Sequence, residues 1–362
     1  MKWFDTYTSN TIGAGGNQLH FSTQGDVMTG RIYYKVFAGG EYNYSLLFSN
    51  VMDSTYKFGE ESHCNLICDE WELLHAEIGV CGATGVEEAG EVSAFLPLTF
   101  AGEKNKKVSP GEFFTCDPIP LSAKKGDYIC FQATYRGNMI PYHWESILPI
   151  FIQENGKWVR DKRVPIPGMI GCDRKVKARI GFFGDSITQG VGTPDNAYTH
   201  WNALISDSIG EDYSYWNLGI GYAKGQDAAC DGAWMFKARQ NDGVVVAFGS
   251  NDVGRGRSLE DMKQDFKAIV DKLHEYGLKV FLISVPPFDW QDEFLERWKG
   301  INRYLVDELS REVEGFFDIA PLLVDYSQWE GKSKYEKHPN EEGCRIWAEN
   351  MLPLFRDFVN KL

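Results

Sequence analysis

The sequence contains no apolar run long enough to cross a bilayer, which takes about 20 consecutive apolar residues. Its first residues, Met1 to Thr6, also lack the apolar core of a signal peptide. We therefore expect a cytoplasmic protein without a membrane-inserted segment.

Positive charge is scarce in this chain. It has 37 Lys and Arg residues against 51 Asp and Glu residues, a formal net charge of -14. Nucleic acids and anionic membrane surfaces are themselves negatively charged and would be repelled. The composition therefore disfavours both as partners.

Sequence patterns that bind metals or phosphate groups are missing as well. The eight cysteines are scattered, and no second close pair completes a zinc site with Cys64 and Cys68. No glycine-rich loop of the phosphate-cradling type is found. We expect no metal or organic cofactor, and we expect reduced, mostly buried thiols.

The first half of the chain has the pattern of short strands separated by turns. Residues 31–37, 42–48 and 127–135 mix β-branched and aromatic side chains, and glycine or asparagine turns lie beside them. This pattern predicts an antiparallel β-sandwich (jelly-roll-like) domain at residues 1–170.

After residue 170, predicted strands and helices alternate. The apolar runs 179–183, 244–248 and 279–285 are typical of strands buried in a parallel sheet. A helix is predicted between Ser258, which can cap it, and Gly277, and its apolar stripe comprises Met262, Phe266, Ile269, Val270 and Leu273. The alternation predicts an α/β domain with a doubly wound parallel sheet at residues 171–362.

Four residues whose side chains or backbone could take part in catalysis lie after predicted strands or in the last loop. Ser186, Gly219 and Asn251 come just after the strands at 179–183, 213–217 and 244–248, and His338 lies in the last loop. Ligands of an open parallel sheet bind outside the carboxyl ends of its strands. We therefore expect these four residues at one edge of the sheet.

These residue types suit acyl transfer. A serine hydroxyl becomes a nucleophile when a neighbouring base takes its proton, and the pKa of histidine suits that task near neutral pH. Backbone N–H groups and an asparagine amide can stabilise the oxyanion that forms on the attacked carbonyl. The set predicts a site that hydrolyses esters.

Four motifs that contain these residues resemble the sequence blocks of SGNH (GDSL) hydrolases. In the order of the family they are Gly184-Asp185-Ser186-Ile187-Thr188, Asn217-Leu218-Gly219, Gly249-Ser250-Asn251-Asp252 and His338-Pro339-Asn340. The resemblance covers residues 176–362. It implies that Ser186 is the nucleophile and His338 the base and acid, that Gly219, Asn251 and the Ser186 N–H hold the oxyanion, and that Asp185 and Asp252 are structural.

One position departs from the family pattern. Three residues before the histidine, where the family usually has an aspartate that orients the imidazole, this chain has Tyr335. A tyrosine hydroxyl is uncharged near pH 7. Glu336, a backbone carbonyl or a more distant acid could orient His338 instead, so the sequence predicts a Ser–His pair with the third member open.

The order of the two domains resembles a group of carbohydrate esterases in which a β-sheet domain precedes an SGNH domain. Residues 117–121 and 125–128 also resemble the β-domain of such enzymes. The resemblance implies removal of acyl groups, above all acetyl, from sugars or oligosaccharides.

Two other interpretations remain open. One is a lipase or thioesterase that acts on longer acyl esters, and the other is a carbohydrate-binding protein with an inactive hydrolase half. Trp290 and Trp329 are predicted near the catalytic edge, where they could stack on sugar rings or pack between domains. The sequence indicates neither the oligomeric state nor the position of the acyl group on the sugar.

Overall fold

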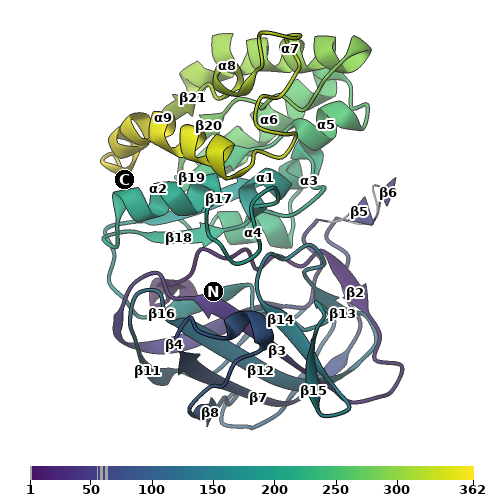
Figure 1. The fold of residues 1–362 in the computed structure, drawn as a ribbon, viewed down its shortest axis with the longest axis vertical. Helices are drawn as coiled ribbons and strands as arrows, with labels where there is room; N and C mark the ends of the chain where they lie inside the picture. Colours follow the sequence, from purple (N-terminus) through teal and green to yellow (C-terminus); the bar gives the residue numbers. More distant parts are fainter. Residues whose placement is uncertain (1, 55, 58–59, 62–63) are drawn as a thin grey trace. The chain divides into compact units, whose positions relative to one another are not determined.

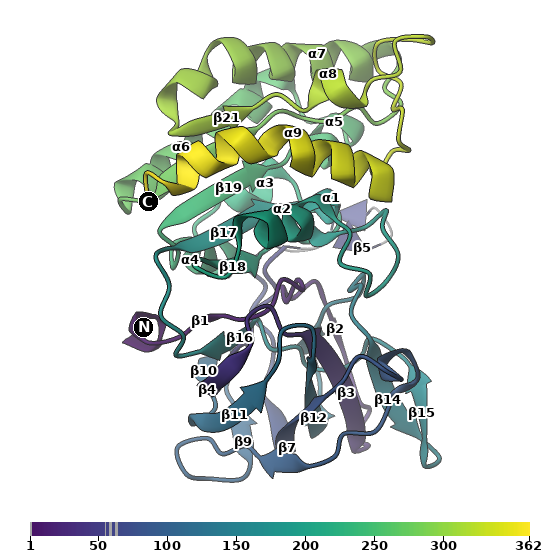
Figure 2. The same ribbon diagram turned by 60° about the vertical axis from the view of Figure 1, so that its left-hand side comes forward.

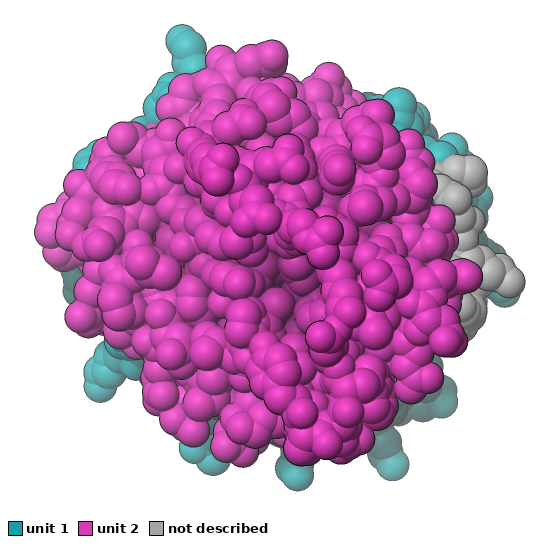
Figure 3. Space-filling model, turned by 90° about the horizontal axis from the view of Figure 1, so that it is seen from above, with its two compact units in different colours: residues 1–175 teal, residues 176–362 magenta. Residues whose placement is uncertain are grey.

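A computed structural model describes residues 2–54, 56–57, 60–61 and 64–362. The chain forms two compact units, Met1–Lys175 and Val176–Leu362, which are coloured separately in Figure 3. The predicted boundary at residue 170 falls within strand β16 (Met169–Cys172). This strand pairs with β4 (Gly40–Ser49), so the first unit continues past the predicted boundary.

The first unit contains two antiparallel sheets (Figure 1). One has the order β1 (Thr8–Ser9), β16, β4, β10 (Phe113–Thr115), with β11 (Ile119–Ala123) also paired to β4. The other has the order β15 (Lys157–Arg160), β14 (Ile150–Glu154), β3 (Met28–Lys35), β12 (Tyr128–Gly137), β7 (Trp71–Cys81), β8 (Phe95–Pro97), with β9 (Lys106–Val108) paired to β7. Two small pairs accompany them, β2 (Leu19–Phe21) with β13 (Ile140–Tyr142) and β5 (Tyr56–Lys57) with β6 (Glu60–Glu61).

The two sheets pack face to face because alternate side chains of each strand are apolar. On β12 the residues Ile129, Phe131 and Ala133 are buried, while Gln132 and Thr134 on the opposite face are half-buried. The ring of Phe131 lies 5.5 Å from that of Phe48 on β4, across the sandwich core. The antiparallel β-sandwich predicted from the sequence is confirmed.

The second unit is built on a five-stranded parallel sheet. Its strand order is β18 (Ser214–Asn217), β17 (Arg179–Gly184), β19 (Gly243–Ala247), β20 (Lys279–Ile283), β21 (Gly315–Phe317). Numbered along this unit the order is 2-1-3-4-5, a doubly wound arrangement whose switch point lies between β17 and β19. The α/β fold class predicted from the sequence is confirmed.

Nine α-helices are assigned among the described residues of this unit. They are α1 (Ser186–Gln189), α2 (Trp201–Ile209), α3 (Gly225–Ala229), α4 (Ala233–Ala238), α5 (Ser250–Gly254), α6 (Leu259–Glu275), α7 (Asp292–Asp307), α8 (Ala320–Leu323) and α9 (Glu341–Val359). The predicted cap of α6 is present, because the Ser258 hydroxyl accepts a hydrogen bond from the Asp261 N–H at 3.1 Å. The apolar stripe predicted for this helix is buried.

Helices cover both faces of the sheet. Neighbouring residues of β17 point to opposite faces, and each of them contacts a different helix. Phe182 contacts Trp201 of α2, with ring centroids 5.4 Å apart, whereas Phe183 contacts Trp234 of α4 at 4.6 Å. Trp201 in turn stacks on Trp347, which joins α2 to α9 on the same face (Figure 2). In the ranges described by the structure, no helix is both long and apolar enough to cross a membrane.

Candidate active site

Ser186 lies where β17 turns into α1, at the carboxyl edge of the sheet. The turn is tight: a Cβ atom at Gly184 would lie 2.1 Å from the Thr188 hydroxyl. Asp185 caps α1 through a hydrogen bond that its carboxylate accepts from the Ile187 N–H at 3.0 Å. Because Ser186 is the first residue of this helix, its own N–H has no intrahelical acceptor and can serve a ligand.

His338 meets Ser186 across 152 residues of sequence. The Ser186 Oγ and His338 Nε2 atoms lie 2.9 Å apart, at hydrogen-bond distance. The ring of Phe288 stands nearly perpendicular to the imidazole at 5.0 Å. A Cβ atom on Gly192 would come within 2.8 Å of the His338 Cβ, so only glycine fits beside the ring. Tight packing therefore holds the imidazole in reach of the hydroxyl.

No carboxylate of the described residues is bonded to His338. Glu336 has a left-handed backbone (φ 67°), is exposed, and its Oε1 lies 3.5 Å from the Asn340 amide nitrogen. Tyr335 lies against Gly343 at the start of α9. Neither side chain makes a hydrogen bond to the imidazole. Glu336, one of the candidates left open by the sequence, is therefore not bonded to the ring in this structure.

Burial without a charged partner lowers the pKa of His338 to about 4, from an ordinary value of 6.5. A histidine base works only while it is neutral, so activity should be lost as the pH falls through the pKa of the folded protein. We expect kcat/KM for an activated ester to stay on its plateau down to about pH 5 and to fall with a midpoint near 4.

The pH profile of kcat/KM measures this midpoint, provided that circular dichroism shows the chain still folded at each pH. That control is needed because burial lowers the pKa of His200 and His338 to about 4, so the unfolded chain binds protons more readily in acid and the fold loses stability there. A midpoint at or above 6.5 would show that an acid stabilises the imidazolium.

Asn251 lies at the start of α5, just after β19, the strand beside β17. Its Nδ2 donates one hydrogen bond to the Ala223 carbonyl at 3.0 Å. A side-chain amide nitrogen carries two hydrogens, so the second one can serve an oxyanion. The next residue, Asp252, is buried and accepts a hydrogen bond from the Gly225 N–H at 3.0 Å. The side chains of Asn251 and Asp252 thus hold the backbone of the segment that follows β18 in place.

The Gly219 N–H already has an acceptor in the structure. It donates to the Asn217 Oδ1 at 2.9 Å. The role in the oxyanion hole predicted for Gly219 therefore requires that this bond be shared or broken. A Cβ atom at Gly219 would lie 2.2 Å from the Gln189 N, so the glycine is needed for close packing between this loop and α1.

The two tryptophans predicted near this edge differ in exposure. Trp290 is buried, and its ring stacks on Phe288 at 5.5 Å, so it packs inside the loop instead of presenting an open face. Trp329 is half-buried, and its Nε1 donates to the Trp290 carbonyl at 2.9 Å. Trp290 does not fit the predicted sugar platform.

Sequence reasoning missed three residues that shape the site, namely Phe288, Gly192 and Asn217. Phe288 follows the predicted strand 279–285, and this position at a strand end was a usable signal. Nothing in the sequence pattern indicated that Gly192 lies against His338 or that Asn217 accepts from Gly219.

Comparisons with known proteins concern mainly the second unit. Residues 182–346 match the GDSL-like lipase/acylhydrolase family. No curated protein matches the chain.

Several solved structures are similar over part or all of the chain. A lipolytic G-D-S-L family protein from Desulfitobacterium hafniense is 20% identical, with 49% of this chain and 98% of that one covered at a TM-score of 0.40. An acetyl-xylooligosaccharide esterase mutant from Geobacillus is 18% identical, with 51% of this chain and 95% of that one covered at a TM-score of 0.39. A family two carbohydrate esterase mutant from Clostridium thermocellum is 12% identical, covering 98% of both chains at a TM-score of 0.42.

Proposed function

We propose that the protein is a serine esterase with Ser186 as its nucleophile, since residues 182–346 match the GDSL-like lipase/acylhydrolase family. The observation that carries the proposal is the 2.9 Å contact between the Ser186 hydroxyl and the His338 Nε2. A hydroxyl in this position can pass its proton to the imidazole as it attacks a carbonyl.

The proposed reaction has two halves. In the first, Ser186 Oγ bonds to the ester carbonyl carbon, His338 takes the hydroxyl proton, and the carbonyl oxygen becomes an oxyanion. The intermediate collapses as His338 returns that proton to the leaving alcohol, which leaves an acyl group on Ser186. In the second half water attacks the acyl group by the same steps and releases the carboxylic acid.

The oxyanion needs preorganised hydrogen-bond donors, and we assign two groups to this role. The Ser186 N–H lies at the first position of α1, and the Asn251 amide keeps one hydrogen beyond its bond to Ala223. Donors of this kind stabilise the transition state because they are already oriented before charge develops. Gly219 would join them only if its N–H left Asn217.

A Ser–His pair without a carboxylate favours esters over amides as substrates. The imidazolium formed during attack lacks an adjacent negative charge, so it protonates the leaving group readily, whereas the neutral imidazole is a weak base. An alcohol leaves a tetrahedral intermediate more easily than an amine does. Ester hydrolysis is therefore the reaction that this pair serves best.

We further propose that the esters are acyl, mainly acetyl, esters of carbohydrates. The order of the two units supports this proposal. An antiparallel sandwich precedes the unit that contains Ser186, and this order resembles that of the carbohydrate esterases to which the sequence is similar. Such a substrate needs no cofactor, because the serine, the histidine and the oxyanion donors suffice for the chemistry.

Acetate release tests the proposed substrate class. Acetylated xylo-, manno- and cello-oligosaccharides are incubated with the protein, and acetate is measured alongside a nitrophenyl ester series from acetyl to long acyl chains. We expect acetate from at least one oligosaccharide and a preference for acetyl in the series. Turnover of long acyl esters without any acetate release would instead support a lipase or thioesterase.

A further inference from the structure

A cavity of about 490 Å³ lies at the carboxyl end of β21, between α7 and the segment that begins at α8. None of the four candidate catalytic residues lines it. Its volume falls within the range of ~300–1,000 Å³ of small-molecule sites. The strands β19 and β20 separate β21 from β17, a distance of roughly 14 Å at ~4.8 Å per strand.

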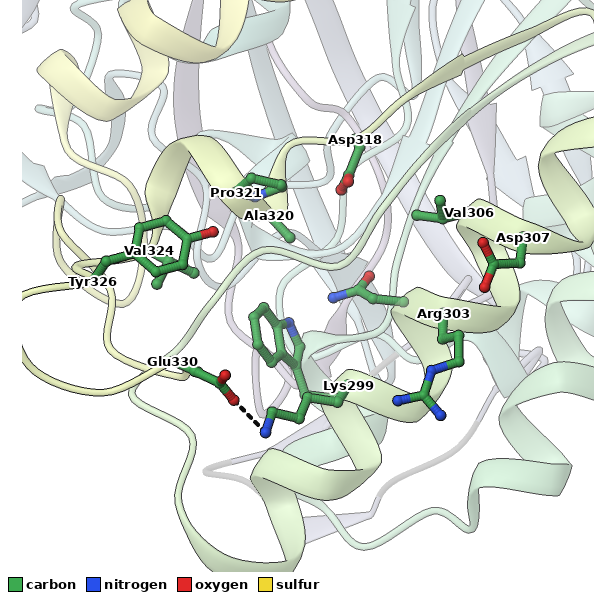
Figure 4. Close-up of a pocket in the computed structure, with 12 residues that line it drawn as sticks. Lys299, Arg303, Val306, Asp307, Asp318, Ala320, Pro321, Val324, Tyr326 and Glu330 are labelled. Atoms are coloured by element: carbon green, nitrogen blue, oxygen red, sulfur yellow. Dashed lines mark ion pairs between the residues drawn. The ribbon is translucent and has the colours of Figure 1, made fainter.

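Two apolar side chains on opposite sides of the cavity are open to solvent (Figure 4). Tyr326 is 69% exposed and Val306 38%, so both belong to the few large hydrophobic residues with open surfaces. The indole of Trp298 also lines the cavity, and its Nε1 is held by the Val285 carbonyl at 2.8 Å. The exposed ring of Tyr326 offers a flat surface on which an apolar face of a ligand can stack, whereas the Trp298 indole is buried.

The remaining wall carries polar groups with unused bonding capacity. Asp318 accepts one hydrogen bond from the Ser284 hydroxyl at 2.7 Å, and within the described residues its other carboxylate oxygen is unbonded. Arg303 and Asp307 lie on the opposite side of the cavity from Tyr326 (Figure 4). In the part of the chain that the structure describes, neither makes an ion pair or a hydrogen bond through its side chain.

The charges of the wall nearly cancel. Lys299 forms an ion pair with Glu330, as the dashed line in Figure 4 marks. The other charged groups that line the cavity are Arg303, Asp307 and Asp318, so carboxylates outnumber cations by one. A strongly anionic ligand would meet this excess of carboxylates, whereas a neutral ligand rich in hydroxyls can donate to the carboxylates and accept from the guanidinium.

We propose that this cavity is a saccharide-binding site separate from the catalytic one. A sugar ring has apolar C–H faces that can stack on Tyr326 and hydroxyls that can bond to Arg303 and Asp318. The volume admits a short oligosaccharide. The choice of a saccharide among neutral polyhydroxylated ligands rests on the proposed function.

The cavity and the catalytic histidine share one segment of chain. Tyr326 and Glu330 lie in the stretch that runs from α8 to His338, and this stretch is pinned by the Lys334 N–H, which donates to the Leu323 carbonyl at 2.8 Å. If a longer substrate spans the roughly 14 Å between β21 and β17, a saccharide held in the cavity would keep another part of it near Ser186. Such tethering raises the effective concentration of a linked acyl group.

Titration calorimetry with unacetylated xylotriose, mannotriose and cellotriose tests the proposal. We expect the wild-type protein to bind at least one of them, and Tyr326→Ala and Arg303→Ala each to weaken that binding by about tenfold. Tyr276→Ala removes a comparably exposed tyrosine (57%) outside the cavity and should leave the affinity unchanged.

Absence of binding to all three trisaccharides would overturn the proposal, as would binding that both cavity variants leave intact. The esterase proposal fails separately. If the trisaccharides bind in the cavity but no acetylated substrate is turned over, the binding site stands and the catalytic proposal does not.

Discussion

Replacement of Ser186 by alanine is expected to lower kcat for an activated acetyl ester by at least about 10³-fold, because among the described residues only the Ser186 hydroxyl is hydrogen-bonded to His338. His338→Ala should cause a loss of similar size. The two residues act as one unit, so the double variant should be little worse than either single one. Steady-state kinetics of the three variants measures the losses.

Glu336→Gln provides the matched control within the catalytic loop. Its side chain is exposed and makes no bond to the imidazole, so we expect kcat to change by less than about threefold. A loss comparable to that of His338→Ala would show that Glu336 moves onto the histidine during turnover. Retention of wild-type activity in Ser186→Ala would contradict the assignment of the nucleophile itself.

Replacement of Asn251 by alanine is expected to lower kcat by about 10²–10³-fold while KM changes little, because an oxyanion donor acts mainly in the transition state. The amide also holds the Ala223 carbonyl, so part of any loss could come from the loop after β18. A second asparagine separates the two effects.

Asn241 is the matched control, since its amide also donates to backbone carbonyls, those of Lys237 and Ala238, but it precedes β19 at the amino end of the strand. Asn241→Ala should lower the free energy of unfolding by about 1–2 kcal/mol and leave kcat nearly unchanged. Equal effects of the two variants on kcat would argue against Asn251 as an oxyanion donor.

Local pattern was enough to predict both architectures. The run 244–248 was predicted as a buried strand because it is continuously apolar, and β19 occupies 243–247. The helix after Ser258 was predictable because its cap, its stripe and its terminating glycine agree with one another. These signals are short-range, so each can be read without knowledge of the rest of the chain.

The details of the site were not predictable in the same way. The bond from the Gly219 N–H to Asn217, the burial of Trp290 and the position of Phe288 over His338 all depend on how distant loops pack together. The orientation of Glu336 follows from its left-handed backbone, for which no glycine or turn motif gave a signal. The motifs predicted that Ser186 and His338 meet, but tertiary packing decides which atoms of the site are free.

The predicted end of the first domain, residue 170, falls inside a strand of the sandwich. A proline-rich stretch, Pro165-Ile166-Pro167-Gly168, had the composition of a linker. The chain nevertheless returns to the sandwich afterwards, because Met169–Cys172 pairs with β4. Strand pairing over more than 100 residues of sequence leaves little trace in local composition.

Covalent labelling tests the central claim most directly. The protein is treated with an alkyl fluorophosphonate, which reacts with activated serine hydroxyls, and the modified peptide is identified by mass spectrometry. We expect one adduct on Ser186, no adduct in Ser186→Ala, and much slower labelling in His338→Ala. An adduct on another residue, or no adduct on folded protein, would contradict the assignment of Ser186 and His338 as a nucleophile and its base.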